Sequence, residues 1–190
     1  GLYKNILVVG AEVLSGFIDW KDRSTCVLFG DGAGAAVLSS ETRGHKIVAS
    51  CLGSDGSQGD ILKIPAGGSA QPPSEETVKQ GLHFLKMQGS EVFKVAVRTM
   101  EGAVREVIAK TNLGVGDIQL LIPHQANRRI LQAVAERLEL PEEKVFINVD
   151  RYGNMSSAST VVALYEAEKM GRLKPNDHVV LVAFGGGLTW

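Results

Sequence analysis

The chain has 190 residues, the length of one ordinary domain, and 44% of them are hydrophobic, which is ample for a buried core. Its 20 basic residues against 21 acidic ones leave a net charge of −1, so bulk charge indicates neither nucleic acid nor a membrane as a partner. We expect a cytoplasmic protein, because the sequence shows no secretory leader and no apolar run long enough to span a bilayer.

Residues 1–50 are predicted to be rich in strands. Apolar runs at residues 6–9, 26–29 and 35–38 each have the length and composition of a short strand. The first begins almost at residue 1, and the chain stops at Trp190 with nothing to close its last strand. We therefore expect the chain to be a fragment of a larger fold.

A loose stretch at residues 50–81 leads to a long amphipathic helix. The stretch is crowded with Gly, Ser, Pro and Gln, which predicts either a functional lid or a linker. Ser90 is expected to cap the helix, which extends to about Lys110 and carries Lys94 on its exposed face. Its buried side is predicted to hold apolar residues at helical spacing, namely Val92, Ala96, Val97, Met100, Val104, Val107 and Ile108.

The rest of the chain alternates between strands and helices. Strands are predicted at residues 120–122, 145–149 and 179–184. Between them lie a helix at 128–138 and another that ends near Met170. This order implies right-handed crossovers and a parallel sheet covered on both faces, so the predicted fold class is α/β.

Each of these three strands leads into a group that can bind or react. His124 follows the first strand, Asn154 follows the second, and Gly185, Gly186 and Gly187 follow the third. Open α/β sheets place their chemistry at the carboxyl ends of strands. An imidazole, a carboxamide and bare backbone N–H groups could together hold a developing oxyanion.

Each group also has a structural interpretation. A lone histidine is more often a surface or hydrogen-bonded structural residue than a catalyst, although Pro123 and the helix after Asn127 hold His124 at a defined place. Asn154 by itself is better explained as the N-cap of the next helix or as a turn residue. The glycine run could be a simple strand end, but residues without Cβ also let a substrate approach the main chain.

Two features of the sequence are misleading. Residues 30–35 fit the loose form of the dinucleotide fingerprint, yet residues 35–38 read as a strand where that motif requires a helix. Cys26 lies in an apolar run, which predicts a buried and inert thiol rather than a nucleophile for His124. Cys26 and Cys51 have no metal-ligand or redox spacing, so we expect two reduced thiols and no metal site.

Four segments follow one another in a specific order. They are Phe-Gly-Asp-Gly-Ala-Gly-Ala-Ala at 29–36, Pro-His-Gln-Ala-Asn-Arg-Arg-Ile at 123–130, Asp-Arg-Tyr-Gly-Asn-Met-Ser-Ser-Ala-Ser at 150–159 and Ala-Phe-Gly-Gly-Gly at 183–187. Together they resemble the β-ketoacyl-acyl carrier protein synthase III family over essentially the whole chain. The resemblance implies a thiolase-like layered α/β fold with mixed sheets, built from two similar halves, and a homodimer.

The resemblance also implies an activity. Members of the family condense an acyl-CoA primer, such as acetyl-CoA, with malonyl-acyl carrier protein through a Cys-His-Asn site, which begins fatty acid synthesis. The family's nucleophilic cysteine lies upstream of what is Gly1 here, so this chain alone would be inactive. Residues 1–50 would complete the N-terminal half, 51–88 would connect, and 89–190 would form the C-terminal half.

Site residues follow from the resemblance position by position. His124 and Asn154 match the catalytic pair, and Gly186 matches a backbone donor to the thioester oxygen. The coenzyme A or phosphopantetheine arm would be bound by Arg23, Gly89, Phe93 and Asn127. Carrier-protein contacts would come from Gln125, Ala126, Asn127, Arg128, Arg129 and Lys94. Acyl-CoA and the carrier are the implied partners, with no cofactor, nucleic acid or membrane, and Arg128 could equally be a solvated helix residue.

Two alternatives remain open. The first is another condensing enzyme of the thiolase superfamily, although plant-type polyketide synthases end differently from Phe-Gly-Gly-Gly and degradative thiolases place near the C-terminus a cysteine that is absent here. The second is a non-catalytic partner subunit of such an enzyme. A cysteine just upstream of Gly1 would support catalysis, and another residue there would support a scaffold.

Overall fold

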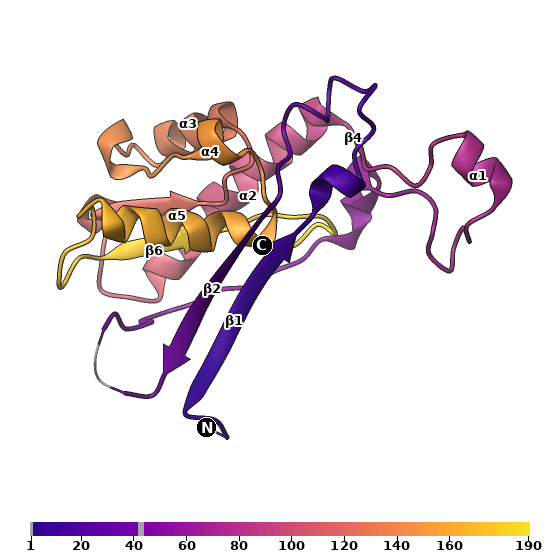
Figure 1. The fold of residues 1–190 in the computed structure, drawn as a ribbon. Coiled ribbons are helices and arrows are strands. Elements are labelled where there is room, and N and C mark those ends of the chain that lie inside the picture. The colour runs from indigo at the N-terminus through magenta and orange to yellow at the C-terminus, as the bar shows by residue number, and fades with distance from the viewer. Residues whose placement is uncertain (1, 42–43) are drawn as a thin grey trace.

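The structure is a computed structural model that describes residues 2–41 and 44–190 (Figure 1). Its strands pair in separate short sheets, antiparallel in one part and parallel in another, and helices pack beside them. The predicted α/β class is therefore confirmed. Of the helices in the described ranges, none has the length and apolar character needed to cross a bilayer.

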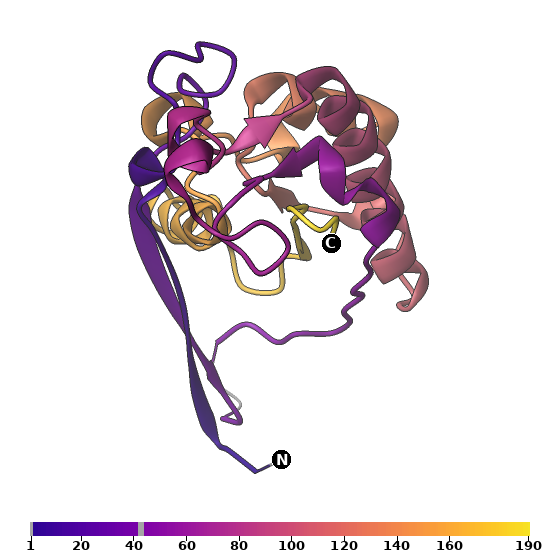
Figure 2. The same ribbon diagram turned by 90° about the vertical axis from the view of Figure 1, so that its right-hand side faces the viewer.

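An antiparallel ribbon forms the N-terminal part of the chain. Strands β1 (Asn5–Glu12) and β2 (Gly32–Ser39) pair over their full length, which confirms the strands predicted at 6–9 and 35–38. The ribbon extends away from the helices, and residues 44–53 then run back to the helical part as an extended segment (Figure 2). Much of its apolar surface is exposed; for example, Leu7 and Val37 are both 66% exposed.

The strand predicted at residues 26–29 is wrong, because this segment forms turns around Asp22. The Asp22 carboxylate accepts hydrogen bonds from the Ser24 amide at 2.9 Å and the Thr25 hydroxyl at 3.0 Å, and its carbonyl accepts from the Cys26 amide at 3.0 Å. Asp22 thus organises these turns through both its side chain and its backbone carbonyl. Cys26 is partly exposed rather than buried, so that prediction is also wrong.

The stretch predicted as a lid or linker contains several short elements. They are the 3₁₀ helix η2 (Gly56–Ile61), strand β3 (Leu62–Lys63) and helix α1 (Glu75–Lys79), and β3 pairs with β4 (Lys86–Met87). Just before η2, residues 53–55 pair with the end of the chain: the Gly53 amide donates to the Trp190 carbonyl at 2.9 Å and the Leu188 amide to the Asp55 carbonyl at 2.9 Å. The expectation that nothing pairs with the chain's last residues is wrong.

Helix α2 (Gly89–Ala109) supplies one wall of the main core. It begins one residue before the predicted cap, and Ser90 lies inside it, so the capping role of Ser90 is wrong. The predicted apolar face is confirmed, except that Val107 is only partly buried. The buried residues of the helix are Val92, Val95, Ala96, Val97, Met100, Ala103, Val104 and Ile108.

The C-terminal part is built on two parallel strands. Strand β5 (Leu120–Pro123) pairs in parallel with β6 (Val179–Val182), and all of β5 is buried. Helix α3 (Arg128–Arg137) follows β5, as predicted, with Ile130, Leu131 and Val134 buried, and it packs against α2. Three further short 3₁₀ helices are η1 (Leu14–Gly16), η3 (Val115–Asp117) and η4 (Glu142–Lys144).

The strand predicted at residues 145–149 is reduced to one parallel bridge between Val145 and Leu121. The Gln125 carboxamide donates to the Phe146 carbonyl at 3.1 Å and accepts from the Asn148 amide at 2.9 Å. A side chain therefore occupies the backbone groups that a ladder would use, and helix α4 (Val149–Tyr152) begins instead.

Helix α5 (Ser157–Lys169) joins the two parts of the chain. It contacts β1 and β2 as well as β5 (Figure 1). Ala158, Ala163 and Ala167 are fully buried along it. Small side chains let a helix approach strands on more than one side, so the ribbon and the C-terminal sheet are held together through α5.

Candidate active site

The carboxyl ends of β5 and β6 lie at one edge of the parallel sheet, and two of the predicted groups are there. His124 directly follows β5, and its amide donates to the Val182 carbonyl at 2.7 Å. The glycine run begins at Gly185, shortly after Val182. The parallel register thus places the imidazole-bearing residue beside the start of the glycine run.

From the chain topology we infer that Asn154 lies toward the same edge. The segment at Val145 runs parallel to β5, and α5 then crosses back toward the start of β6. Asn154 lies at the beginning of this return. Its amide donates to the Leu28 carbonyl at 2.8 Å and its carbonyl accepts from the Gly30 amide at 3.0 Å, which anchors its backbone on both sides.

The side chain of Asn154 forms a turn and does not cap the helix, so the N-cap interpretation is wrong. Its Oδ1 accepts from the Ser156 amide at 2.8 Å, before α5 begins at Ser157. The helix start is instead bonded by Glu12 of β1, whose carboxylate accepts from the Ser157 hydroxyl at 2.6 Å. Within the described ranges the Asn154 amide nitrogen has no hydrogen-bond partner, so two N–H donors remain available.

His124 is neutral at neutral pH. The residue is 8% exposed, and burial lowers the pKa of its imidazole to about 4. Among the residues that the structure describes, none bonds to the ring nitrogens. A neutral imidazole carries one N–H donor, and this donor is free for a ligand.

The glycine run forms a tight turn that exposes backbone. The Gly185 amide donates to the Thr189 carbonyl at 3.0 Å, and the Thr189 amide donates back at 3.2 Å. At the tip, the Gly186 amide bonds to no group in the described part of the chain. Gly187 has a φ of 137°, where a Cβ would also lie 3.0 Å from the Thr189 side chain, so glycine is required there.

Gly30 is a residue of the site whose role the sequence reasoning missed. A Cβ on Gly30 would lie 2.1 Å from the Tyr152 carbonyl oxygen, so only glycine lets the two backbones meet beside Asn154. The strand that follows Gly30 confirms that the fingerprint-like glycines are not a dinucleotide loop. The available signal was the spacing of glycines at 30, 32 and 34, which indicates close backbone approach.

Gln125 does not lie on the surface, where a carrier protein could contact it. Its side chain is fully buried and hydrogen-bonded, and any additional chain could only cover it further. The predicted docking role of Gln125 is therefore wrong. Its neighbour Asn127 is partly exposed and caps α3, because its Oδ1 accepts from the Ile130 amide at 3.0 Å.

Residues predicted to bind the substrate arm and the carrier gather where α2 and α3 begin. The Arg129 guanidinium lies over the Phe93 ring, 5.7 Å from its centroid, and links the N-terminal parts of the two helices. Gly89 is the first residue of α2. Lys94 is exposed and pairs with Glu91 at 2.9 Å.

Arg23 is connected to the start of α2 only through contacts made by nearby residues. It lies in the turns around Asp22, close in sequence to Asp19, whose carboxylate is 4.0 Å from the Lys86 ammonium just before α2. The Leu85 amide also donates to the Phe17 carbonyl at 2.8 Å. The backbone that carries Arg23 is thus tied to the segment that leads into α2, and the guanidinium itself is exposed.

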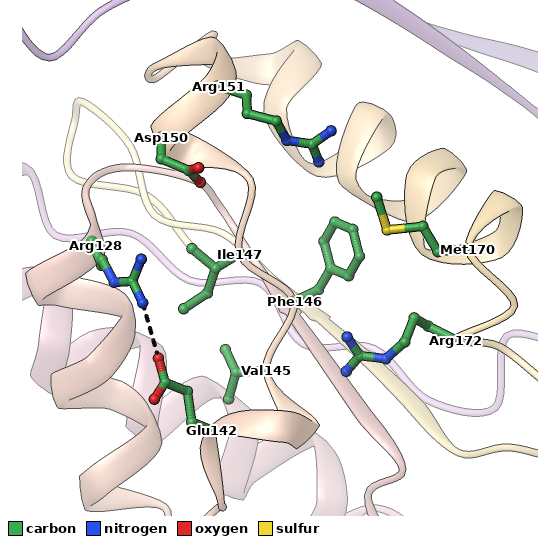
Figure 3. A pocket seen from close by; sticks show the side chains of 9 residues that line it. All are labelled: Arg128, Glu142, Val145, Phe146, Ile147, Asp150, Arg151, Met170 and Arg172. Atoms are coloured by element: carbon green, nitrogen blue, oxygen red, sulfur yellow. Dashed lines mark hydrogen bonds and ion pairs between the residues drawn. The ribbon is translucent and has the colours of Figure 1, made fainter.

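Arg128 points elsewhere, toward Glu142 at 3.2 Å. The two lie in a pocket of about 300 Å³ that also includes Arg151 and Arg172 (Figure 3). Arg151 pairs with Glu166 at 2.5 Å, and Arg172 donates to the Glu143 carbonyl. Each guanidinium is already bonded within the protein, so the pocket is a place of structural pairing. Neither His124 nor Asn154 lines it.

Comparison with known families identifies the chain. Residues 1–56 match the sequence profile of 3-oxoacyl-[acyl-carrier-protein (ACP)] synthase III, and residues 108–190 match the profile of its C-terminal part. The chain belongs to the 3-oxoacyl-[acyl-carrier-protein] synthase III family. The family predicted from the four sequence segments is confirmed.

Individual relatives agree with this membership. The chain is 54% identical over 190 residues to beta-ketoacyl-[acyl-carrier-protein] synthase III of Caldanaerobacter subterraneus, covering 100% of the chain and 57% of the relative. It is 55% identical over 190 residues to the corresponding protein of Clostridioides difficile, covering 100% of the chain and 58% of the relative. The chain thus spans little more than half the length of these relatives.

Solved structures of the synthase III family confirm the fold. A beta-ketoacyl-[acyl carrier protein] synthase III from Thermus thermophilus matches with a TM-score of 0.88 at 48% identity, covering 100% of this chain and 58% of that one. A 3-oxoacyl-[acyl-carrier-protein] synthase III from Aquifex aeolicus matches with a TM-score of 0.87 at 46% identity, covering 98% of this chain and 56% of that one. The predicted thiolase-like α/β fold is therefore confirmed.

We expect the His124 imidazole to titrate at a pH of about 4, because burial disfavours its charged form. Above pH 6.5 the group is neutral in both the folded and unfolded states. Below pH 6.5 the unfolded state takes up a proton that the folded state does not, so this group lowers stability progressively down to about pH 4. NMR titration, with the resonance assigned from a His124→Asn variant, measures the pKa. A midpoint near 6.5 would contradict the burial.

We expect Gly30→Ala to destabilise the protein by roughly 1–3 kcal/mol, because its Cβ would collide with backbone and overpacking costs about that much. Gly102→Ala is the matched control: it lies in α2 with nothing within 4 Å of its Cβ, and should be neutral or stabilising by up to about 1 kcal/mol. Urea unfolding measures both. Equal stability of the two variants would show that Tyr152 and Gly30 do not meet as described.

Proposed function

We propose that the protein containing this chain catalyses decarboxylative Claisen condensation of an acyl-CoA primer, such as acetyl-CoA, with malonyl-acyl carrier protein. The product would be a 3-oxoacyl-acyl carrier protein, the first intermediate of fatty acid synthesis. The observation that carries the proposal is a neutral, buried imidazole at the sheet edge where the glycine run that contains the Gly186 amide also begins. Membership of the synthase III family supports the same reaction.

His124 and Asn154 would act on the decarboxylation step. Loss of CO2 from a malonyl thioester leaves negative charge on the enolate oxygen. Two neutral N–H donors aimed at that oxygen stabilise the charge more in the transition state than in the ground state. The low pKa of His124 suits this role, because a protonated imidazole could transfer its proton to the enolate before the carbon–carbon bond forms.

Gly186 would act in the acyl-transfer half of the reaction. A cysteine thiolate from the part of the protein upstream of this chain would attack the acyl-CoA thioester. The Gly186 amide, with the amide of that cysteine, would face the developing oxyanion. This assignment is supported by the unbonded and exposed Gly186 amide. The chain alone would then lack the nucleophile and be inactive.

The starts of α2 and α3 would receive the phosphopantetheine arm and the carrier. Arg23, Gly89, Phe93 and Asn127 are proposed to line the arm, pairing charge with phosphate and apolar surface with the linker. Lys94 and Arg129 would form a basic rim for an acidic carrier, with Ala126 beside them. Arg128 is left out of the rim because it pairs with Glu142.

Other features of the proposal concern the whole protein. It would need no cofactor, because the thiolate, the two donors and the backbone amides account for every step. We further propose a cytoplasmic homodimer, and a division of this chain at residues 1–50, 51–88 and 89–190 into the end of one thiolase-like half, a connection and the second half. Membership of the synthase III family supports these points.

His124→Ala in the complete enzyme should slow malonyl decarboxylation by about 10²- to 10³-fold, the usual loss for one oxyanion donor. Transfer of acyl from acyl-CoA to the cysteine should persist. Carbon dioxide release measures the first step, and intact-protein mass spectrometry measures the second. His178→Ala is the control, because His178 is exposed and its hydrogen bonds use only its backbone. Condensation by His124→Ala at the normal rate would refute the assignment.

Charge reversal at Lys94 and Arg129 should raise the KM for malonyl-carrier more than the KM for acyl-CoA, because the rim would meet the carrier's acidic surface. Lys174→Glu makes the same charge change at an exposed site between α5 and β6 and should leave both constants near normal. Steady-state kinetics at two salt concentrations measures the effect. Equal increases in KM for both substrates would contradict the proposed docking role of Lys94 and Arg129.

A further inference from the structure

The Gln125 side chain makes every hydrogen bond that a carboxamide can make. Its amide nitrogen donates to the Pro123 carbonyl at 2.8 Å and the Phe146 carbonyl at 3.1 Å. Its oxygen accepts from the Asn148 amide at 2.9 Å and the Val149 amide at 3.1 Å. A primary amide has two N–H donors and one oxygen with two lone pairs, so the group is fully satisfied while completely buried.

These four partners belong to the two segments that carry the site. Pro123 immediately precedes His124, so one bond fixes the end of the strand that delivers the imidazole. The other three bonds hold the chain as it enters α4, where Asn148 makes no side-chain cap. The first amides of a helix need a partner, and the Gln125 oxygen supplies it from across the sheet edge. Asn154 follows two residues after α4 ends at Tyr152.

A second group also holds α4. The Glu166 carboxylate of α5 accepts from Asn148 Nδ2 at 2.8 Å and from the Tyr152 hydroxyl at 2.6 Å. It also pairs with Arg151 at 2.5 Å. Helix α4 is therefore held by contacts from both Gln125 and Glu166, and it can shift only if one of these contacts breaks. Of the two, only Gln125 also bonds to the strand that carries His124.

We propose that Gln125 is a positioning residue that keeps His124 and Asn154 in register with each other, an inference that rests on the proposed function. Gln125 does not touch the substrate, because it is completely buried. It sets the relative placement of two donors that must meet one enolate oxygen. A displacement of about 1 Å at such a site can cost about 10²-fold in rate.

The two half-reactions separate positioning from general structural support. Decarboxylation depends on His124 and Asn154 together, whereas acyl transfer to the cysteine depends on the thiolate and on Gly186. A loss of register between the donors therefore lowers kcat for decarboxylation and leaves cysteine acylation and both KM values near normal. A residue needed only for folding would lower the amount of active enzyme, and both half-reactions would fall by the same factor.

The substitution Q125E tests this in the complete enzyme. It keeps the size of the side chain, but at neutral pH a carboxylate has no N–H to donate and faces the Pro123 and Phe146 carbonyls. Burial raises the pKa of a carboxyl group, and the protonated form regains one donor. We expect decarboxylation by Q125E to fall at least tenfold at pH 8 and to recover, relative to wild type, as the pH is lowered to 6.

The measurements are carbon dioxide release from malonyl-carrier, acyl-enzyme formation by mass spectrometry, and circular dichroism to verify folding. Q125N, which retains a neutral amide one methylene too short, should show the same selective loss without pH recovery. If Q125E does not fold, Q125N alone provides the test. Unchanged decarboxylation in a folded variant, or equal losses in both half-reactions, would overturn the proposal. Wild-type protein that acylates but does not condense would instead refute the proposed function.

Discussion

The parallel pairing of β5 with β6 is the constraint on which the arrangement of the site depends. Parallel strands end at the same edge, so the register that matches Pro123 with Val182 also sets where His124 and the glycine run begin. Because β5 is buried along its whole length, core packing holds this register. A slip by one residue would turn His124 toward the opposite face of the sheet.

Neutral donors and positive charges are carried by different elements of the fold. At the sheet edge the available donors are neutral: the buried imidazole of His124, the amide of Asn154 and the backbone at Gly186. Positive charge lies instead where α2 and α3 begin, at Lys94 and Arg129. Neutral donors can stabilise developing charge without holding a strongly bound anion beforehand, whereas exposed cations suit the attraction of an anionic partner.

Periodicity was enough to predict α2, α3, β5 and β6, because each buries an apolar face. It failed at residues 26–29 and 145–149 for different local reasons. At 26–29 the chain forms turns instead, in which the Asp22 carbonyl accepts from the Cys26 amide. At 145–149 the Gln125 side chain binds the backbone that a strand partner would have bound. The polar sequence around Gln125 therefore suggested a surface loop. His124, Asn154 and Gly186 could be recognised from the sequence as residues that follow predicted strands. The close approach of the Gly30 and Tyr152 backbones became evident only in the structure.

The stacking of Arg129 on Phe93 has a consequence for how tightly an anion could be held. A free arginine side chain loses rotamer freedom when it binds, which weakens the complex. Here the aromatic ring already limits the orientations of the guanidinium, so the side chain loses less conformational entropy when an anion binds. Such preorganisation would lengthen the lifetime of an encounter at this corner, whereas an unrestrained arginine would mainly change how often encounters occur.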